Sequence, residues 1–173
     1  MSTLKVGAIT SLTGNNAATI ANDGKLTTVA PLSVTTPILV QAAMNLTMAT
    51  TGIIVWNEKQ IDTTSSYSTS TGRFTCPRAG YYEVSFNYLL RNCTSGHRTN
   101  VRKNGINQGH ASPNSSKSIV WTYVNTGEVN IAASLIVNCA QNDLLDVHLT
   151  YLANGDIYGG GNVHNSLNIK FLG

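Results

Sequence analysis

Charged residues are scarce in this sequence of 173 residues, since Asp, Glu, Lys and Arg together make up only 11% of it. An ordinary soluble domain carries roughly 25%. The deficit does not indicate disorder, because β-branched and aromatic residues are plentiful and the net charge is only +3. Thr, Ser, Asn and Gly replace the missing charged residues, and this composition is typical of an all-β protein with many turns. Copies of such a chain have little electrostatic repulsion to keep them apart.

Cysteine is also sparse, and its spacing excludes the common metal sites. Cys76, Cys93 and Cys139 are an odd number with no CxxC pair, so no zinc site is expected. One disulfide remains an alternative. Free buried thiols are the expectation for a protein that is assembled in a reducing cytosol.

Long hydrophobic runs are absent as well. The longest, Ile53–Trp56, is far shorter than the ~20 apolar residues that a membrane-spanning helix needs. The first ten residues carry one lysine and no continuous apolar stretch, so we expect no signal peptide and assembly in the cytoplasm of a cell. No membrane insertion is expected.

The basic residues do not form a nucleic-acid site, although the sequence pI is about 8.8. They are scattered, and their closest cluster consists only of Arg98, Arg102 and Lys103. Nucleic-acid-binding proteins usually carry a longer basic stripe with stacking aromatic residues. We therefore expect no nucleic-acid partner.

Catalytic motifs are missing too, so the protein is not expected to be an enzyme and no catalytic residue is assigned. The sequence contains no HExxH, no GxSxG and no glycine-rich phosphate loop, and Gly159–Gly161 is not followed by Lys-Ser or Lys-Thr. Asp143 and Asp146 form the one close acidic pair near the start of a strand. They are a candidate calcium site, with a solvated loop end as the alternative, and no other metal or cofactor is expected.

The first 36 residues differ from the rest and are expected to form a β-hairpin arm and linker. Turn sequences at 13–16 and 22–24 separate short β-prone runs, and Asp-Gly in the second turn is a strong hairpin signal. The runs are too short to bury a core alone, so they need a partner surface. The apolar residues of this docking arm are Leu4, Val6, Ile9, Ile20 and Leu26.

Residues 37–173 alternate strands and turns up to the C-terminus. Residues 81–88 place Tyr82, Val84, Phe86 and Tyr88 on one face. Asn104-Gly105 predicts a type I′ hairpin turn. Residues 38–44, 131–137, 144–152 and 166–172 are further strand candidates, and no helix is convincing. The eight to ten short strands indicate a sandwich or a jelly roll.

One segment carries a specific resemblance. "YSTSTGRFTCPRAGYYEVSFNY" at Tyr67–Tyr88 resembles the signature of the C1q/TNF-like family, Y-D-x-x-T-G-x-F-T-C-P-x-x-G-x-Y-x-F-S, with Ser68 and Val84 as departures. Segments 101–106, 134–149 and 161–173 agree with the family in order, although Asn142 replaces a family glycine. The signature and core residues are Tyr67, Gly72, Phe74, Pro77, Gly80, Tyr82 and Phe86.

The resemblance implies a ten-stranded jelly-roll sandwich, over residues 37–173, that assembles as a tight homotrimer. Aromatic and apolar residues would then lie along the threefold axis, and some C1q-like trimers bind calcium near it. Tyr88, Val147, Tyr151 and Phe171 are the candidates for the trimer interface, each with the core of a single copy as its alternative place.

The N-terminal segment resembles a second group of proteins. "LKVGAITSLTGNNAATIANDGKL" at Leu4–Leu26 is similar to the N-terminal stretch of phage tail-fibre and virion proteins, where short hairpins lead into a variable C-terminal domain. The hypothesis is a phage virion protein, assembled in the host cytoplasm. It would dock on other virion proteins through residues 1–36 and bind a host-surface glycan or protein through loops 94–99, 110–118 and 153–164.

Two other functions remain as alternatives. A trimeric capsid decoration (cement) protein would use the same arm on the head lattice, and the absence of a long shaft sequence favours it. A cellular C1q-like ligand would be expected to carry a signal peptide and a collagen-like stalk.

Overall fold

The computed structural model describes residues 8–10, 16–20, 23, 26–28, 37–108, 120–123, 127–161 and 164–173. Contacts divide the chain into two compact units, Met1–Thr36 and Pro37–Gly173. No α-helix occurs in these described ranges, and so none of them holds a helix that could cross a membrane.

The N-terminal unit contains a three-stranded antiparallel sheet in the order β1-β2-β3. Ile20 lies opposite Leu26, so the second predicted hairpin is present. Ile9 belongs to the first strand, whereas Leu4 and Val6 lie outside the described residues. The strands are β1 (Ala8–Thr10), β2 (Asn16–Ile20) and β3 (Leu26–Thr28).

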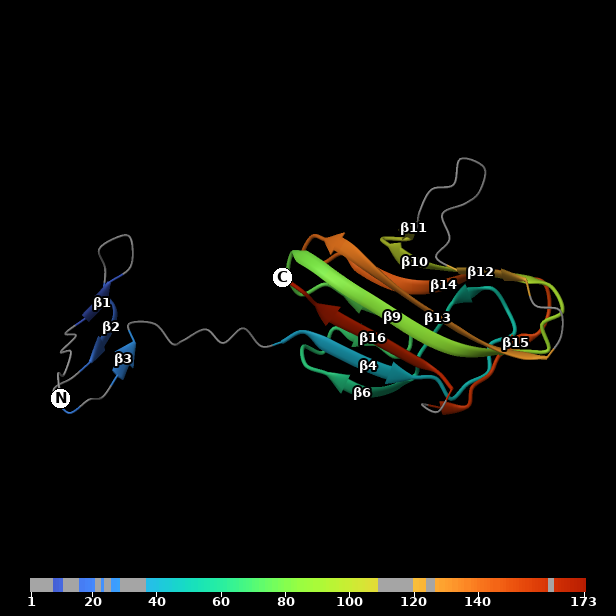
Figure 1. Ribbon diagram of the computed structural model, residues 1–173, viewed down its shortest axis with the longest axis horizontal. Coiled ribbons are helices and arrows are strands. Elements are labelled where there is room, and N and C mark those ends of the chain that lie inside the picture. The colour runs from blue at the N-terminus through green and yellow to red at the C-terminus, as the bar shows by residue number, and fades with distance from the viewer. Residues whose placement is uncertain are drawn as a thin grey trace, which may run out of the picture. The chain divides into compact units, whose positions relative to one another are not determined.

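The second unit is a sandwich of two sheets, which confirms the all-β jelly-roll class. The first sheet has six strands in the order β13-β9-β16-β4-β6, with β15 beside β9. Figure 1 shows β9, β16, β4 and β6 side by side in one layer, with β10 and β14 in the other. The strands of the first sheet are β13 (Glu128–Cys139), β9 (Gly80–Arg91), β16 (Ser166–Phe171), β4 (Leu39–Ala43), β6 (Glu58–Asp62) and β15 (Asp156–Ile157).

The second sheet has seven strands in the order β11-β10-β14-β8-β7, with β12 beside β10 and β5 beside β14. The two sheets contain more strands than the ten expected. Four of them, β5, β7, β11 and β15, are short segments of only two residues each. The strands of this sheet are β11 (Ile106–Asn107), β10 (Gly96–Lys103), β14 (Leu144–Leu152), β8 (Arg73–Thr75), β7 (Tyr67–Ser68), β12 (Val120–Tyr123) and β5 (Gly52–Ile53).

The core forms between the sheets around the alternating residues of β9. Tyr82, Val84, Phe86 and Tyr88 are all buried, as the alternation predicts. Phe74 of the second sheet packs edge-on against Tyr82, with 5.6 Å between the ring centroids. Each such large side chain contributes about 1.5–3 kcal/mol when it is buried. The signature is therefore mainly a packing motif, with Tyr67 also buried in this core.

Glycine is required at two signature positions for steric reasons. Gly72 has φ +68°, and a Cβ there would lie 2.8 Å from the carbonyl oxygen of Ile54. Gly80 has φ +141°, and a Cβ there would collide with the carbonyl of Gly173. Pro77 lies between β8 and β9, outside both ladders.

The predicted hairpin turn at Asn104-Gly105 is also present. Both residues have positive φ values, 52° and 80°, as a type I′ turn requires. The turn joins β10 to β11, where Lys103 lies opposite Ile106.

The segment expected as the loop 94–99 is partly a strand. Since β10 begins at Gly96, His97 and Thr99 face the core and are fully buried. The His97 ring packs edge-on against Tyr88, with 6.2 Å between centroids. Burial disfavours the charged imidazole and lowers the pKa of His97 below its ordinary 6.5.

A Gly72→Ala substitution is expected to destabilise the domain more than Gly105→Ala. Both residues have positive φ, but a Cβ at Gly105 meets nothing within 4 Å. Gly105→Ala should therefore cost about 1–2 kcal/mol from backbone strain alone, and Gly72→Ala at least about 1 kcal/mol more through overpacking. Urea unfolding of the two variants measures this difference, and equal losses would contradict it.

Stability is expected to fall in mild acid because His97 is buried in its neutral form. The unfolded chain binds the proton more tightly, so this contribution is complete above about pH 6.5 and is lost as the pH falls through that value towards the lower folded pKa. The slope reaches at most about 1.4 kcal/mol per pH unit. Thermal unfolding between about pH 8 and pH 5 should show a flatter profile for His97→Phe, and unchanged slopes would contradict the assignment.

Candidate assembly interface

The outer surface of the six-stranded sheet is a candidate surface for binding. The inward direction of Tyr82 and Phe86 forces their neighbours along β9 to point outward. The ladders place Ser134 opposite Ser85 and Ser166 opposite Asn87. We call this surface the β9 face, and it consists of Tyr81, Glu83, Ser85, Asn87, Ala132, Ser134, Ile136, Asn138, Ser166, Asn168, Lys170 and Leu172.

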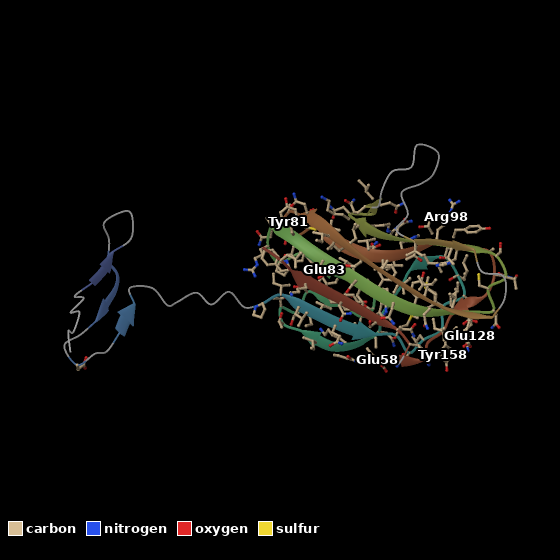
Figure 2. All side chains as sticks on the ribbon, viewed as in Figure 1. Glu58, Tyr81, Glu83, Arg98, Glu128 and Tyr158 are labelled. Atoms are coloured by element: carbon tan, nitrogen blue, oxygen red, sulfur yellow. The ribbon has the colours of Figure 1, made fainter. Side chains whose placement is uncertain are left out.

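Charge on the β9 face is low and self-compensating. Glu83 and Lys170 lie directly opposite each other in the β9–β16 ladder. The Ser134 hydroxyl donates to a carboxylate oxygen of Glu83 at 3.1 Å. Figure 2 shows Glu83 on β9, and Arg98 on β10 of the other sheet. Glu83 and Lys170 are the two charged side chains of this face, so covering it removes few charges from water.

The middle of the β9 face is hollowed because its side chains are small. A shallow cavity of about 390 Å³ lies there, and it is lined by residues of β9, β13 and β16. The Asn87 side-chain amide donates to the carbonyl of His164 at 3.1 Å, and Ser166 bonds to the same side chain. A protruding group of another molecule would therefore meet Asn87 and Ser166 side chains that already have hydrogen-bond partners.

One end of the β9 face is apolar. Tyr81 is 53% exposed, Ile136 is 58% exposed and Leu172 is 46% exposed. The Leu172 amide donates to the Tyr81 carbonyl at 2.8 Å, and Tyr81 and Ile136 are diagonal neighbours across the β9–β13 ladder. Exposed apolar side chains that gather in this way mark a contact surface.

The outer surface of the seven-stranded sheet is different in character. Asp146 accepts two hydrogen bonds from Arg102, at 2.7 and 3.1 Å, and lies 3.7 Å from the guanidinium of Arg73. Arg98 lies over the ring of Tyr151, at 6.0 Å from its centroid. Covering this surface would desolvate several arginines at once, so the β9 face is the better candidate for contact between copies.

Two of the four predicted interface residues are corrected by the structure. Tyr88 and Val147 are almost completely buried inside one copy, so their side chains cannot contact another. Tyr151 is 47% exposed, but it belongs to β14 in the seven-stranded sheet. Phe171 is partly buried between Tyr82 and the guanidinium of Arg78, which lies 4.1 Å from the centre of its ring. Register along β9 would have indicated Tyr81 instead.

The acidic pair does not fit a calcium site. Asp143 accepts hydrogen bonds from the Asn104 side chain and from the Ala140 amide, both at 2.8 Å, and these bonds lower its pKa. Asp146 is bound by Arg102, so a cation already occupies its oxygens. Among the residues that the structure describes, no three His, Cys, Asp or Glu side chains come together as a metal site.

Comparison with known proteins agrees with this architecture. The family model of the C1q domain matches residues 39–163. The globular domain of zebrafish complement 1qA protein superposes with a TM-score of 0.58 at 14% identity, covering 78% of this chain and 96% of its own. Murine APRIL at pH 5.0 superposes with a TM-score of 0.56 at 8% identity, covering 79% and 99%. A search among curated proteins finds no match.

An Ile136→Glu substitution is expected to dissociate copies of the chain without unfolding it. The new carboxylate would be buried without a partner, which should weaken association at least about a hundredfold. Light scattering after size-exclusion chromatography measures the mass, and circular dichroism checks the fold.

Two matched substitutions locate the interface. Ile106→Glu makes the same chemical change at a 67% exposed residue in the other sheet and should leave the mass unchanged. The Tyr151→Glu variant should also keep the mass of the unsubstituted protein. The assignment of the β9 face would be contradicted if the Tyr151→Glu variant dissociated while the Ile136→Glu variant stayed assembled.

Proposed function

The chain belongs to the C1q domain family, and we propose that it is a homotrimeric tail-fibre or tail-associated protein of a phage particle. Domains of this family are generally non-catalytic binding modules, and C1q/TNF domains typically form homotrimers. In this proposal residues 1–36 dock on the virion, and residues 37–173 bind the host surface. The protein is made in the host cytoplasm and resides in the virion.

The β9 face supports the trimer. Its charges are offset between Glu83 and Lys170, and its apolar end carries Tyr81, Ile136 and Leu172. Burial of that end between copies removes apolar surface from water, and each fully buried large side chain contributes about 1.5–3 kcal/mol. Low charge over the whole sequence allows copies to approach.

The N-terminal segment is the observation that carries the role in a particle. Its resemblance at Leu4–Leu26 is to virion proteins, and its three short strands form a unit of their own. In the described residues β1 and β3 each have a neighbour on one side only. A free strand edge is suited to pairing with a strand of another protein, which is how a short arm gains affinity.

Polar loops at one end of the sandwich support host binding. The Thr94 amide donates to the Asn154 side chain at 2.9 Å, and the Asn154 amide group donates back to the Thr94 hydroxyl at 2.5 Å. Two predicted binding segments, 94–99 and 153–164, therefore meet in space, although β15 interrupts the second. The segment 110–118 lies outside the described residues. Amide and hydroxyl groups of this kind suit contacts with a glycan or a protein.

The alternative is a trimeric capsid decoration (cement) protein. The unpaired edges of β1 and β3 also suit strand addition to a capsid subunit. In that case the β9 face would still join three copies.

Particle location distinguishes the two functions. Cryo-electron microscopy of purified particles of the phage that encodes this chain should show a few trimers at the tail. Trimers at threefold positions over the head would contradict the fibre proposal and favour cement. Absence of the protein from purified particles, measured by mass spectrometry, would contradict both.

A further inference from the structure

Two of the three cysteines lie near each other although they come from different sheets. Cys76 follows β8 in the seven-stranded sheet, and Cys139 ends β13 in the six-stranded sheet. The two thiols are near enough for each to shift the pKa of the other, and both are buried as free thiols. They therefore face each other where the two sheets meet at one end of the sandwich.

The backbone holds this contact in place. The Cys76 amide donates to the Asp143 carbonyl and the Asn142 amide donates to the Cys76 carbonyl, both at 2.8 Å. The turn after Cys139 is closed by the Ala140 amide, which donates to the Asp143 carboxylate at 2.8 Å. The segment after β8 is thus tied to the turn between β13 and β14, which begins directly after Cys139. Disulfides need such close and fixed backbones.

The environment activates one thiol of the pair. The neighbouring Cys76 thiol lowers the pKa of Cys139, and the Lys103 ammonium acts in the same direction, whereas burial and the Asp143 carboxylate oppose the shift. The Lys103 ammonium is held at this end by its bond to the Asn138 carbonyl at 3.0 Å. A larger thiolate fraction makes a cysteine more reactive toward disulfides.

We propose that Cys76 and Cys139 form a disulfide that links the two sheets when the protein meets a small oxidising disulfide such as oxidised glutathione. The Cys139 thiolate attacks one sulfur of the small disulfide, whose S–S bond breaks and releases the first glutathione. The Cys76 sulfur then attacks the mixed disulfide and releases the second. The two cysteines lose two electrons, the small disulfide gains them, and the two thiol protons end on the released glutathiones.

Cys93 is expected to stay a free thiol, which accounts for the odd number of cysteines. Cys139 lies opposite Gly80 at the first residue of β9, and Cys93 lies two residues beyond Arg91 at the other end. The strand rises ~3.3 Å per residue, so Cys93 is roughly 35 Å from the pair. Its own thiol donates to the Ser95 carbonyl at 3.0 Å.

Peptide mapping of the full native chain tests the disulfide without any substitution. The protein is incubated with oxidised glutathione, alkylated after unfolding, and cut with trypsin. The three cysteines fall in three different peptides: Phe74–Arg78, Asn92–Arg98 and Ser118–Lys170. We expect the first and third peptides to be joined and the second to be alkylated. A Cys93→Ser variant is the matched control and should form the same link.

The link should also raise the thermal midpoint of unfolding. It closes the long stretch of chain from Cys76 to Cys139 and so restricts the unfolded state, which should raise the midpoint by at least about 5 °C. Adding a reductant should reverse the shift, and Cys139→Ala should not show it.

Two results would overturn the proposal. One is three alkylated cysteines after oxidation of the native protein. The other is a link that includes the Cys93 peptide or joins two chains. The proposal concerns the folded sandwich itself, so it holds for a tail fibre and for a cement protein alike.

Discussion

The structure depends on the packing of one face of β9 against the opposite sheet. Tyr82, Val84, Phe86 and Tyr88 are buried along this strand, which pairs with β13 over its whole length and with β16 over half of it. A slip of one residue would move this entire apolar set to solvent. The core therefore determines the register of three strands, and the register in turn determines which side chains face outward.

The two outer surfaces follow from that register and differ in what they can bind. The β9 face presents small polar residues, one opposed pair of charges, and an apolar end formed by Tyr81, Ile136 and Leu172. The other sheet presents arginines held around Asp146. Desolvation is much more costly for the second surface. This difference is the physical basis for assigning contact between copies to the β9 face.

The same sandwich brings distant segments together at its two ends. At one end the turn after β13 meets Cys76, whose thiol shifts the pKa of the Cys139 thiol. At the other end Thr94 and Asn154 join two loops into one polar surface. These contacts connect residues that are far apart in the chain, so alternation along a single strand carries no sign of them.

Local patterns predicted the parts of the structure that depend on local rules. Alternation placed Tyr82 and Phe86 inward, and Asn104-Gly105 formed its turn, since side-chain direction and turn conformation depend on neighbouring residues. The signature at Tyr67–Tyr88 indicated the jelly roll because its glycines and aromatics meet steric demands of that packing. The same alternation along 81–88 places Tyr81 on the outward face, opposite to Tyr82, which makes Tyr81 a better interface candidate than Tyr88.

Only the tertiary structure decided which apolar and acidic residues are available for contacts. Alternation shows that Tyr88 and Val147 share a face with their neighbours, but it does not say whether that face meets the second sheet or another copy. Both are buried in the sandwich. Likewise the sequence makes Asp146 a candidate metal ligand, but its carboxylate is paired with Arg102 of the neighbouring strand β10 and is therefore not available to a metal ion. Burial and charge pairing are set by long-range strand pairing, so they appear only when the sheets are assembled.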